Sequence, residues 1–170
     1  MLKTMSLMLA VVPALLATFS AQAAQPAGWT TFQGTYFEVG VPPGFVAKPE
    51  TDDAGNVNTV KLWNSKLKVE FAVFSPQWSG EAPFKQANPA SEVVEDSETK
   101  KSGMNTSESL TIHAKDKSYI RFVLSQDFND EANSSHTNKT FGIRVPDMKV
   151  YKEVRDLYVK WKGTLVQLAD

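Results

Sequence analysis

The sequence predicts an α+β domain: an antiparallel sheet of about six or seven strands, packed on one face by a C-terminal helix. Between residues 29 and 145, short runs of alternating apolar and polar residues recur, and such runs are typical of half-buried strands. After them, apolar side chains recur at steps of three and four, the period of an amphipathic helix. The turns between the strands are short, which favours antiparallel pairing, because parallel strands need long crossovers.

The first 23 residues match a secretory signal peptide. Lys3 supplies a positive start, and an apolar stretch of roughly 15 residues follows, shorter than the ~20 that cross a bilayer. Ala21 and Ala23 then give the small-residue spacing of a cleavage site. We therefore expect cleavage after Ala23. Residues 24–170 would then be a single free domain in a bacterial periplasm or outside the cell.

Each expected strand is bounded by turn residues. Pro42 to Gly44 ends the first strand, because proline cannot donate to a ladder and glycine permits the turn. The clearest period-two pattern covers residues 67–74 and forms an expected hairpin with the preceding strand. In chain order, the alternation covers residues 37–41, 60–62, 67–74, 110–114, 120–124 and 141–145.

Four segments between these strands carry weaker signals. Residues 50–55 are polar and rich in turn formers, which predicts a loop. Residues 75–90 hold three prolines and predict a long loop or a short helix. Residues 92–101 are charged and fit either an edge strand or an exposed turn of helix. Residues 129–139 are rich in Asn and Ser and predict a surface loop.

A helix is expected after Pro146, with Asp147 as its N-cap. Gly163 costs that helix roughly 1 kcal/mol relative to alanine and marks a break near its end. One apolar stripe should press on the sheet. Its members are Tyr151, Val154, Tyr158, Trp161, Leu165 and Leu168.

Composition excludes several functional classes. The chain has no cysteine, so neither a disulfide nor thiolate chemistry is available. Its formal net charge is −1, which gives no general attraction to nucleic acid or to anionic lipid. Beyond the leader, no stretch is apolar enough to span a membrane.

Residues 34–37, running into Val41-Pro42-Pro43-Gly44-Phe45, resemble the opening strand and turn of PsbP-like domains, a family with bacterial envelope members such as DcrB. The ending is similar too: an Arg-containing strand, a polar loop, a last strand, and a closing helix with an aromatic at Trp161. The resemblance covers residues 30–168. It implies an α/β/α-like sandwich with a binding or assembly role and no enzymatic activity. No site motif matches, so it carries over no functional residue.

No catalytic residue, metal site or cofactor is expected. The chain has no nucleophile elbow, no Ser-x-x-Lys and no phosphate-cradling glycine motif. Its two histidines, His113 and His136, are interpreted as solvated. Asp52, Asp53, Asn56 and Asn58 flank Gly55, but they lack the spacing and terminal Glu of an EF-hand, so they are interpreted as a polar turn.

Five aromatic residues are out of phase with the apolar face or lie in loops, close to Lys61, Lys66 and Lys68. They are candidates for a groove that binds a glycan, a peptide or a partner surface, because exposed aromatics anchor interfaces. The competing interpretation is that residues 75–90 cover this face and bury them. The candidates are Trp29, Tyr36, Trp63, Phe74 and Trp78.

The leading hypothesis is an exported, non-enzymatic binding or accessory protein that acts on a protein or an envelope component. It would engage its partner through the aromatic sheet face or the Pro-rich loop. One alternative is a small periplasmic hydrolase that uses carboxylates such as Glu70, Glu92 or Asp127. Another is a secreted toxin-neutralising or virulence factor. The sequence carries no signal for an oligomeric state.

Overall fold

The computed structural model describes residues 25–78 and 80–168, so the expected leader lies outside the described residues. The described chain forms a seven-stranded and a three-stranded sheet, and every strand pairing in both is antiparallel. The large sheet consists of β3 (Val46–Thr51), β4 (Val57–Asn64), β5 (Val69–Phe74), β9 (Ser135–Val145), β8 (Ile120–Asp130), β7 (Asn105–Ala114) and β6 (Glu92–Ser102), in that order. The small sheet consists of β1 (Thr30–Gln33), β2 (Phe37–Val41) and β10 (Val166–Gln167), with β2 in the middle.

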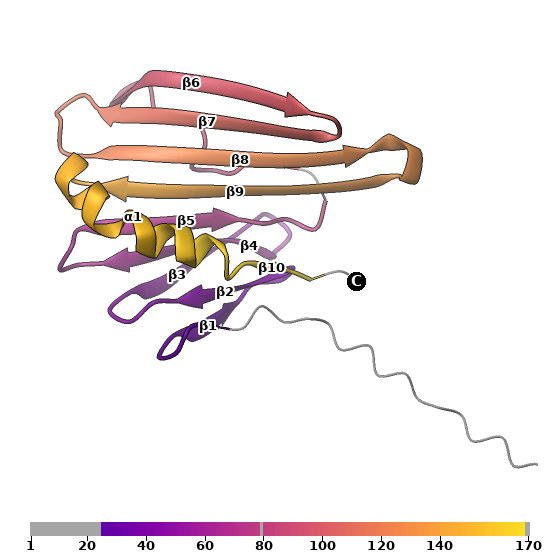
Figure 1. Ribbon diagram of the computed structural model, residues 1–170, viewed down its shortest axis with the longest axis horizontal. Coiled ribbons are helices and arrows are strands. Elements are labelled where there is room, and N and C mark those ends of the chain that lie inside the picture. The colour runs from indigo at the N-terminus through magenta and orange to yellow at the C-terminus, as the bar shows by residue number, and fades with distance from the viewer. Residues whose placement is uncertain (1–24, 79, 169–170) are drawn as a thin grey trace, which may run out of the picture.

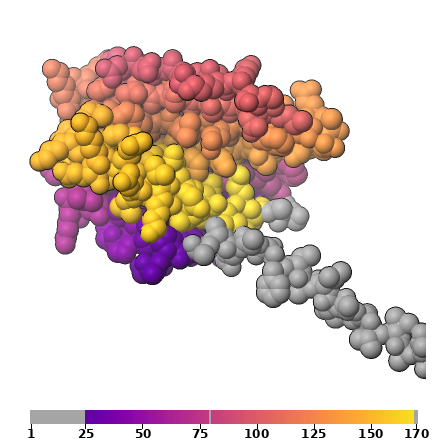
Figure 2. All heavy atoms as spheres, viewed as in Figure 1, coloured from indigo at the N-terminus to yellow at the C-terminus, as the bar shows by residue number. Residues whose placement is uncertain are grey.

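The helix α1 (Met148–Lys162) packs across one face of the large sheet, beside the small sheet (Figure 1). The predicted α+β fold is therefore confirmed. The core lies between α1 and the large sheet. The Phe71 ring of β5 packs against the rings of Tyr158 and Trp161, with centroids 5.2 and 5.1 Å apart. From the helix side, α1 and the C-terminal residues cover the middle of the molecule (Figure 2). No helix in the described part of the chain is both long and apolar enough to cross a membrane.

The helix begins where the sequence predicts. The Asp147 side chain accepts hydrogen bonds from the backbone N–H groups of Lys149 and Val150, which satisfies two otherwise unpaired donors. Val154, Tyr158 and Trp161 are buried, as the apolar stripe predicts.

The helix does not continue to Leu165 and Leu168, because it ends at Lys162 with Gly163 as its C-cap, where the break was predicted; Leu165 still packs against the core. Thr164 Oγ1 accepts the Gly40 N–H at 2.9 Å and donates to the Trp161 carbonyl at 2.7 Å. These bonds tie the chain to β2, and residues 166–167 then pair with β2 as β10. Pairing with a distant strand thus replaces the last helical turn.

The polar loop predicted for residues 129–139 was wrong. This segment holds the end of β8, a short 3₁₀ turn η1 (Glu131–Asn133) and the first part of β9. The Asp130 carboxylate accepts hydrogen bonds from the Asn133 backbone and side chain, at 3.3 and 2.7 Å. The capped turn places Asp130 opposite Ser135, which is the first pair of the β8–β9 hairpin. Residues 131–135 around the turn are exposed, so polar side chains are favourable there.

Two further elements lie at the edges of the large sheet. The charged segment at 92–101 is the edge strand β6, one of the two forms that its sequence fitted. The other edge strand, β3, was not predicted; it contains Pro49 and overlaps the start of the loop predicted at residues 50–55. An edge strand tolerates proline because the N–H groups on its outer side have no neighbouring strand to bond, so a missing N–H there costs no hydrogen bond.

Residues 75–78 and 80–91, here called the strap, lie over the face of the large sheet opposite α1, the face that carries Gly142. The described part of the strap contains only turns and bends, so the predicted long loop is confirmed. Phe84 packs over Gly142 of β9, where an added Cβ would lie 3.1 Å from the ring. The strap is therefore the second covering layer considered in the sequence analysis.

Candidate binding groove

A groove of about 400 Å³ lies where the strap begins, between the C-terminal strand and the start of β9. Its polar wall contains residues 134–137 and Gln167, and its apolar wall comes from aromatic and aliphatic side chains. The apolar members are Tyr36, Pro76, Trp78 and Leu168.

The short strand β10 joins the walls of this groove. Leu168 donates its backbone N–H to the Tyr36 carbonyl at 2.8 Å. The Gln167 side-chain amide donates to Ser75 Oγ and to the Asn138 carbonyl, both at 3.1 Å. One glutamine thus connects the small sheet to the end of β5 and to β9, which fixes the distance between the walls.

Trp78 is the most exposed aromatic candidate, at 64%. An indole held in water at the rim of a groove gains free energy when a partner covers it. Tyr36 is half-buried in the same groove. The structure therefore brings together two of the five aromatic residues singled out in the sequence.

The other three candidates lie elsewhere. Phe74 is only 7% exposed and is buried beneath the strap, where an added Cβ on Gly80 would lie 3.0 Å from its ring. Trp29 is half-buried against the core, with the Lys160 ammonium 5.7 Å from its ring centroid. Trp63 is 36% exposed on β4, opposite Val46, and does not line the groove.

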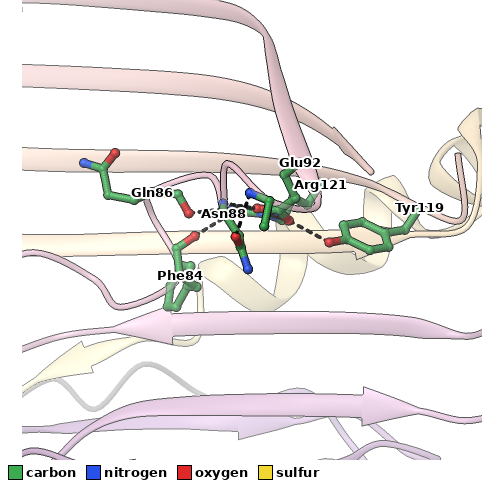
Figure 3. Close-up of polar contacts among 7 residues, drawn as sticks. Phe84, Gln86, Asn88, Glu92, Tyr119 and Arg121 are labelled. Atoms are coloured by element: carbon green, nitrogen blue, oxygen red, sulfur yellow. Dashed lines mark hydrogen bonds and ion pairs between the residues drawn. The ribbon is translucent and has the colours of Figure 1, made fainter. Parts of the chain in front are cut away.

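The strap is fastened to the sheet by Arg121 of β8 (Figure 3). The guanidinium donates to the carbonyls of Phe84 at 2.5 Å and Gln86 at 2.8 Å. It also forms an ion pair with the carboxylate of Glu92, at the start of β6. An arginine forming such a fork fixes both the position and the orientation of its partners.

Glu92 completes this network from the other side. Its carboxylate also accepts the Asn88 N–H and the Tyr119 hydroxyl, each at 2.7 Å. The hydrogen bonds from Arg121 outweigh the cost of burial and lower the pKa of Glu92 from 4.5 to about 2. The carboxylate is therefore ionised at neutral pH. The role of Arg121 was not predicted; its signal in the sequence is an arginine inside the otherwise apolar strand at 120–124.

A smaller polar cavity of about 190 Å³ lies between the strap and the sheet. Lys85 of the strap pairs there with Glu108 at 2.7 Å and with Glu81 at 3.5 Å. Burial lowers the Lys85 pKa, but the two carboxylates outweigh it and raise the pKa overall. Behind them, the buried hydroxyls of Ser125 and Thr140 bond to each other at 3.0 Å.

The carboxylates named for the hydrolase alternative do not converge on one cavity. Glu92 is held by Arg121, as above. Glu70 lies on β5 opposite Arg144 and lines a cavity of only about 30 Å³. Asp127 lines the polar cavity, and one of its carboxylate oxygens lies 2.5 Å from His136 Nε2.

The remaining polar candidates are bonded locally. His113 Nε2 lies 2.5 Å from a carboxylate oxygen of Glu95. The Asp52 carboxylate accepts the N–H groups of Ala54 and Asn56 and the side-chain amides of Asn56 and Asn58, so it organises a turn. Within residues 25–78 and 80–168, no three acidic, histidine or cysteine side chains are grouped for a metal ion.

Neither a protein-family model nor a curated protein matches this sequence. Several solved structures are similar to this chain, and three of them are as follows. Cyanobacterial PsbP (CyanoP) from Synechocystis is 9% identical with a TM-score of 0.45, over 85% of this chain and 95% of that one. The Saccharomyces cerevisiae Ran-binding protein Mog1p is 12% identical with a TM-score of 0.41, over 79% and 91%. A point variant of Mog1 is 12% identical with a TM-score of 0.43, over 83% and 96%.

Proposed function

We propose that this chain is an exported, non-enzymatic binding or accessory protein whose groove holds part of a protein partner. The observation that carries the proposal is the exposure of Trp78, at 64%, on the rim of a groove of about 400 Å³ that it shares with Tyr36. Tryptophan and tyrosine are the side chains most enriched among the residues that dominate binding energy. The sequence resemblance to PsbP-like domains supports a binding role as well.

The anchored strap makes this groove a prepared surface. Arg121 fixes the carbonyls of Phe84 and Gln86, and Phe74 beneath the strap is only 7% exposed. Trp78 therefore belongs to a segment fastened further along the chain. A partner that binds a pre-ordered surface loses less conformational entropy than one that must order a free loop.

The contacts of the carboxylates favour binding over the hydrolase alternative. A general acid or base works best with a pKa near the working pH. The pKa of Glu92 is about 2, and its oxygens already accept bonds from Arg121, Tyr119 and Asn88. That carboxylate holds the strap and does not line the groove beside Trp78.

Site-specific photo-crosslinking in the producing cell tests this function. A photoreactive amino acid replaces Ser135, which is exposed and lines the groove. We expect a discrete protein adduct that disappears when Trp78→Ala is added and persists with Trp63→Ala, the matched tryptophan control. The same reagent at Lys100, on the exposed edge strand β6, should not give that adduct. Adducts that ignore Trp78 would contradict the proposed function.

Export is tested in the same cells. The mass of the chain recovered from the periplasm or the medium should correspond to a first residue of Ala24, as the cleavage motif predicts. An intact chain that begins at Met1 and stays in the cytoplasm would contradict this part of the proposal.

A further inference from the structure

Strand β9 runs past the end of its neighbour β5. β8 pairs with β9 along its whole length, from Ser135 to Val145. β5 pairs only with residues 140–144 of β9, and its last pair is Phe74 with Thr140. Residues 135–139 therefore have a strand on one side only, and this projecting end is visible beyond β5 in Figure 1. We call residues 135–139 the open edge.

The backbone groups on the open edge can be assigned. In an antiparallel strand, alternate residues direct both their N–H and C=O groups to the same neighbour. The Asn138 carbonyl accepts a hydrogen bond from the Gln167 side chain, so the backbone N–H and C=O groups of Asn138 point away from β8. Two residues earlier, the backbone groups of His136 point in the same direction. The partner of His136 in β8 is Asn129. Asn129 donates its N–H to the Met104 carbonyl, on the side away from β9, which is consistent with this assignment.

The backbone of His136 is therefore ready for a further strand. By this alternation its N–H and C=O groups point away from β8, and among the described residues no backbone hydrogen bond from a turn or loop reaches them. The strap cannot supply one by continuing β5: Ser75 donates its N–H to Asn58 on the opposite side, and Pro76 has no N–H. The groove lined by Trp78 and Tyr36 adjoins this edge.

The two outer edges of the large sheet are protected against pairing, whereas the open edge is not. β3 carries Pro49, and the exposed part of β6 carries Glu95, Asp96, Glu98 and two lysines, Lys100 and Lys101. Proline and charge are the usual means of preventing edge-to-edge association. The open edge holds Ser, His, Thr and Asn, and one lysine at its inner end.

We propose that the partner of the groove binds as an extended peptide segment that adds a strand to the open edge, in line with β5. This inference rests on the proposed function and names the form of its partner. The unpaired N–H and C=O of His136 require a donor and an acceptor at strand spacing, which another backbone supplies. The added strand would continue the existing β5–β9 ladder. It would pair with the edge at His136, beside the Asn138 carbonyl that Gln167 already occupies, with alternate side chains directed to the aromatic wall.

Amide hydrogen exchange on the exported chain tests this pairing. The probe is a peptide selected from a phage-displayed library of random dodecapeptides, with wild-type protein as bait and counter-selection on Trp78→Ala. Binding should slow exchange at the His136 amide about tenfold or more, because that group gains a partner. The Thr137 amide already faces β8 and should not change. Protection that alternates along the strand is the signature of an added strand, and contact by side chains alone does not produce it.

A second measurement uses the peptide backbone. Methylation of alternate peptide amides should abolish binding, and methylation of the intervening amides should not. Trp63→Ala protein should bind the peptide as wild type does. A Trp78-dependent peptide that binds without alternating protection would overturn strand addition and leave the groove as a binding site. Recovery of no Trp78-dependent peptide would also overturn strand addition, while the Ser135 crosslinks separately decide the proposed function.

Discussion

Arg121 binds both oxygens of the Glu92 carboxylate, with Nε 2.7 Å from Oε1 and Nη2 2.7 Å from Oε2. The side chains are only 12% and 7% exposed, so the pair is largely removed from water. Because the same guanidinium also holds two carbonyls of the strap, one residue of β8 fixes the layer over the sheet. Substitutions of Arg121 or Glu92 therefore test how the strap is held, without changing a residue that lines the groove.

Arg121→Ala should lower the free energy of unfolding by about 3–5 kcal/mol, because it leaves the Glu92 carboxylate buried without its cation. Urea denaturation followed by circular dichroism measures the loss. The matched control is Lys100→Ala, which removes an exposed ion pair with Glu98 on β6 and should cost less than about 1 kcal/mol. Equal losses in the two variants would show that the Arg121 pair does not fasten the strap.

The same pair predicts a pH dependence. The Glu92 pKa is about 2 in the folded chain and is ordinarily 4.5, so the folded state favours the ionised form. The stability that this provides, on the order of 3 kcal/mol, is fully present above about pH 5 and falls as the pH drops toward 2.

Glu92→Gln isolates this effect. The difference in unfolding free energy between wild type and Glu92→Gln should shrink steadily from pH 5 to pH 2 in urea titrations, while the other carboxylates affect both proteins alike. A difference that stays constant over that range would contradict the assigned role of Glu92.

Gly142→Ala should destabilise the protein by about 1 kcal/mol, because the new Cβ lies 3.1 Å from the Phe84 ring and 3.5 Å from the Ala72 Cβ. The cost should vanish when Phe84→Ala is already present, since the ring that meets the new methyl group is gone. A double-mutant cycle measured by thermal unfolding gives this coupling. Additive effects would mean that Phe84 does not cover Gly142.

Two tryptophans should respond in opposite ways. Trp161 is fully buried and donates its Nε1–H to the Gly40 carbonyl at 2.9 Å, so Trp161→Ala should cost about 3–5 kcal/mol. Trp63→Ala, at a 36% exposed site, should cost about 1 kcal/mol or less.

Trp161→Phe keeps most of the packing and loses the hydrogen bond, so it remains measurable if the alanine variant does not fold. It should cost about 1–3 kcal/mol. Chemical denaturation of the three variants checks the order. A larger loss for Trp63→Ala than for Trp161→Phe would contradict the burial assigned to both side chains.

Local patterns predicted much of the fold. The alternation through residues 67–74 predicts a strand because successive side chains of a strand point to opposite faces. Asp147 predicts the helix start because a carboxylate at that position accepts orphan N–H groups. Each of these signals lies within a few consecutive residues, so it can be recognised in the sequence alone. The same is true of the leader motif before Ala24. The edge strand β3 and the hairpin at 129–139 lack such signals, because their residues are largely polar and show no alternating apolar face, although they pair with the next strand along the chain.

By itself, the sequence determined the α+β class, the phase of the central strands and the set of out-of-phase aromatics. Only the tertiary structure decided which aromatics meet water: the strap buries Phe74, and Trp78 remains exposed beside Tyr36. It also brought together Glu92 and Arg121, which are 29 residues apart. The reason is physical, since alternation fixes which way a side chain points, but what covers it depends on segments far away in the chain.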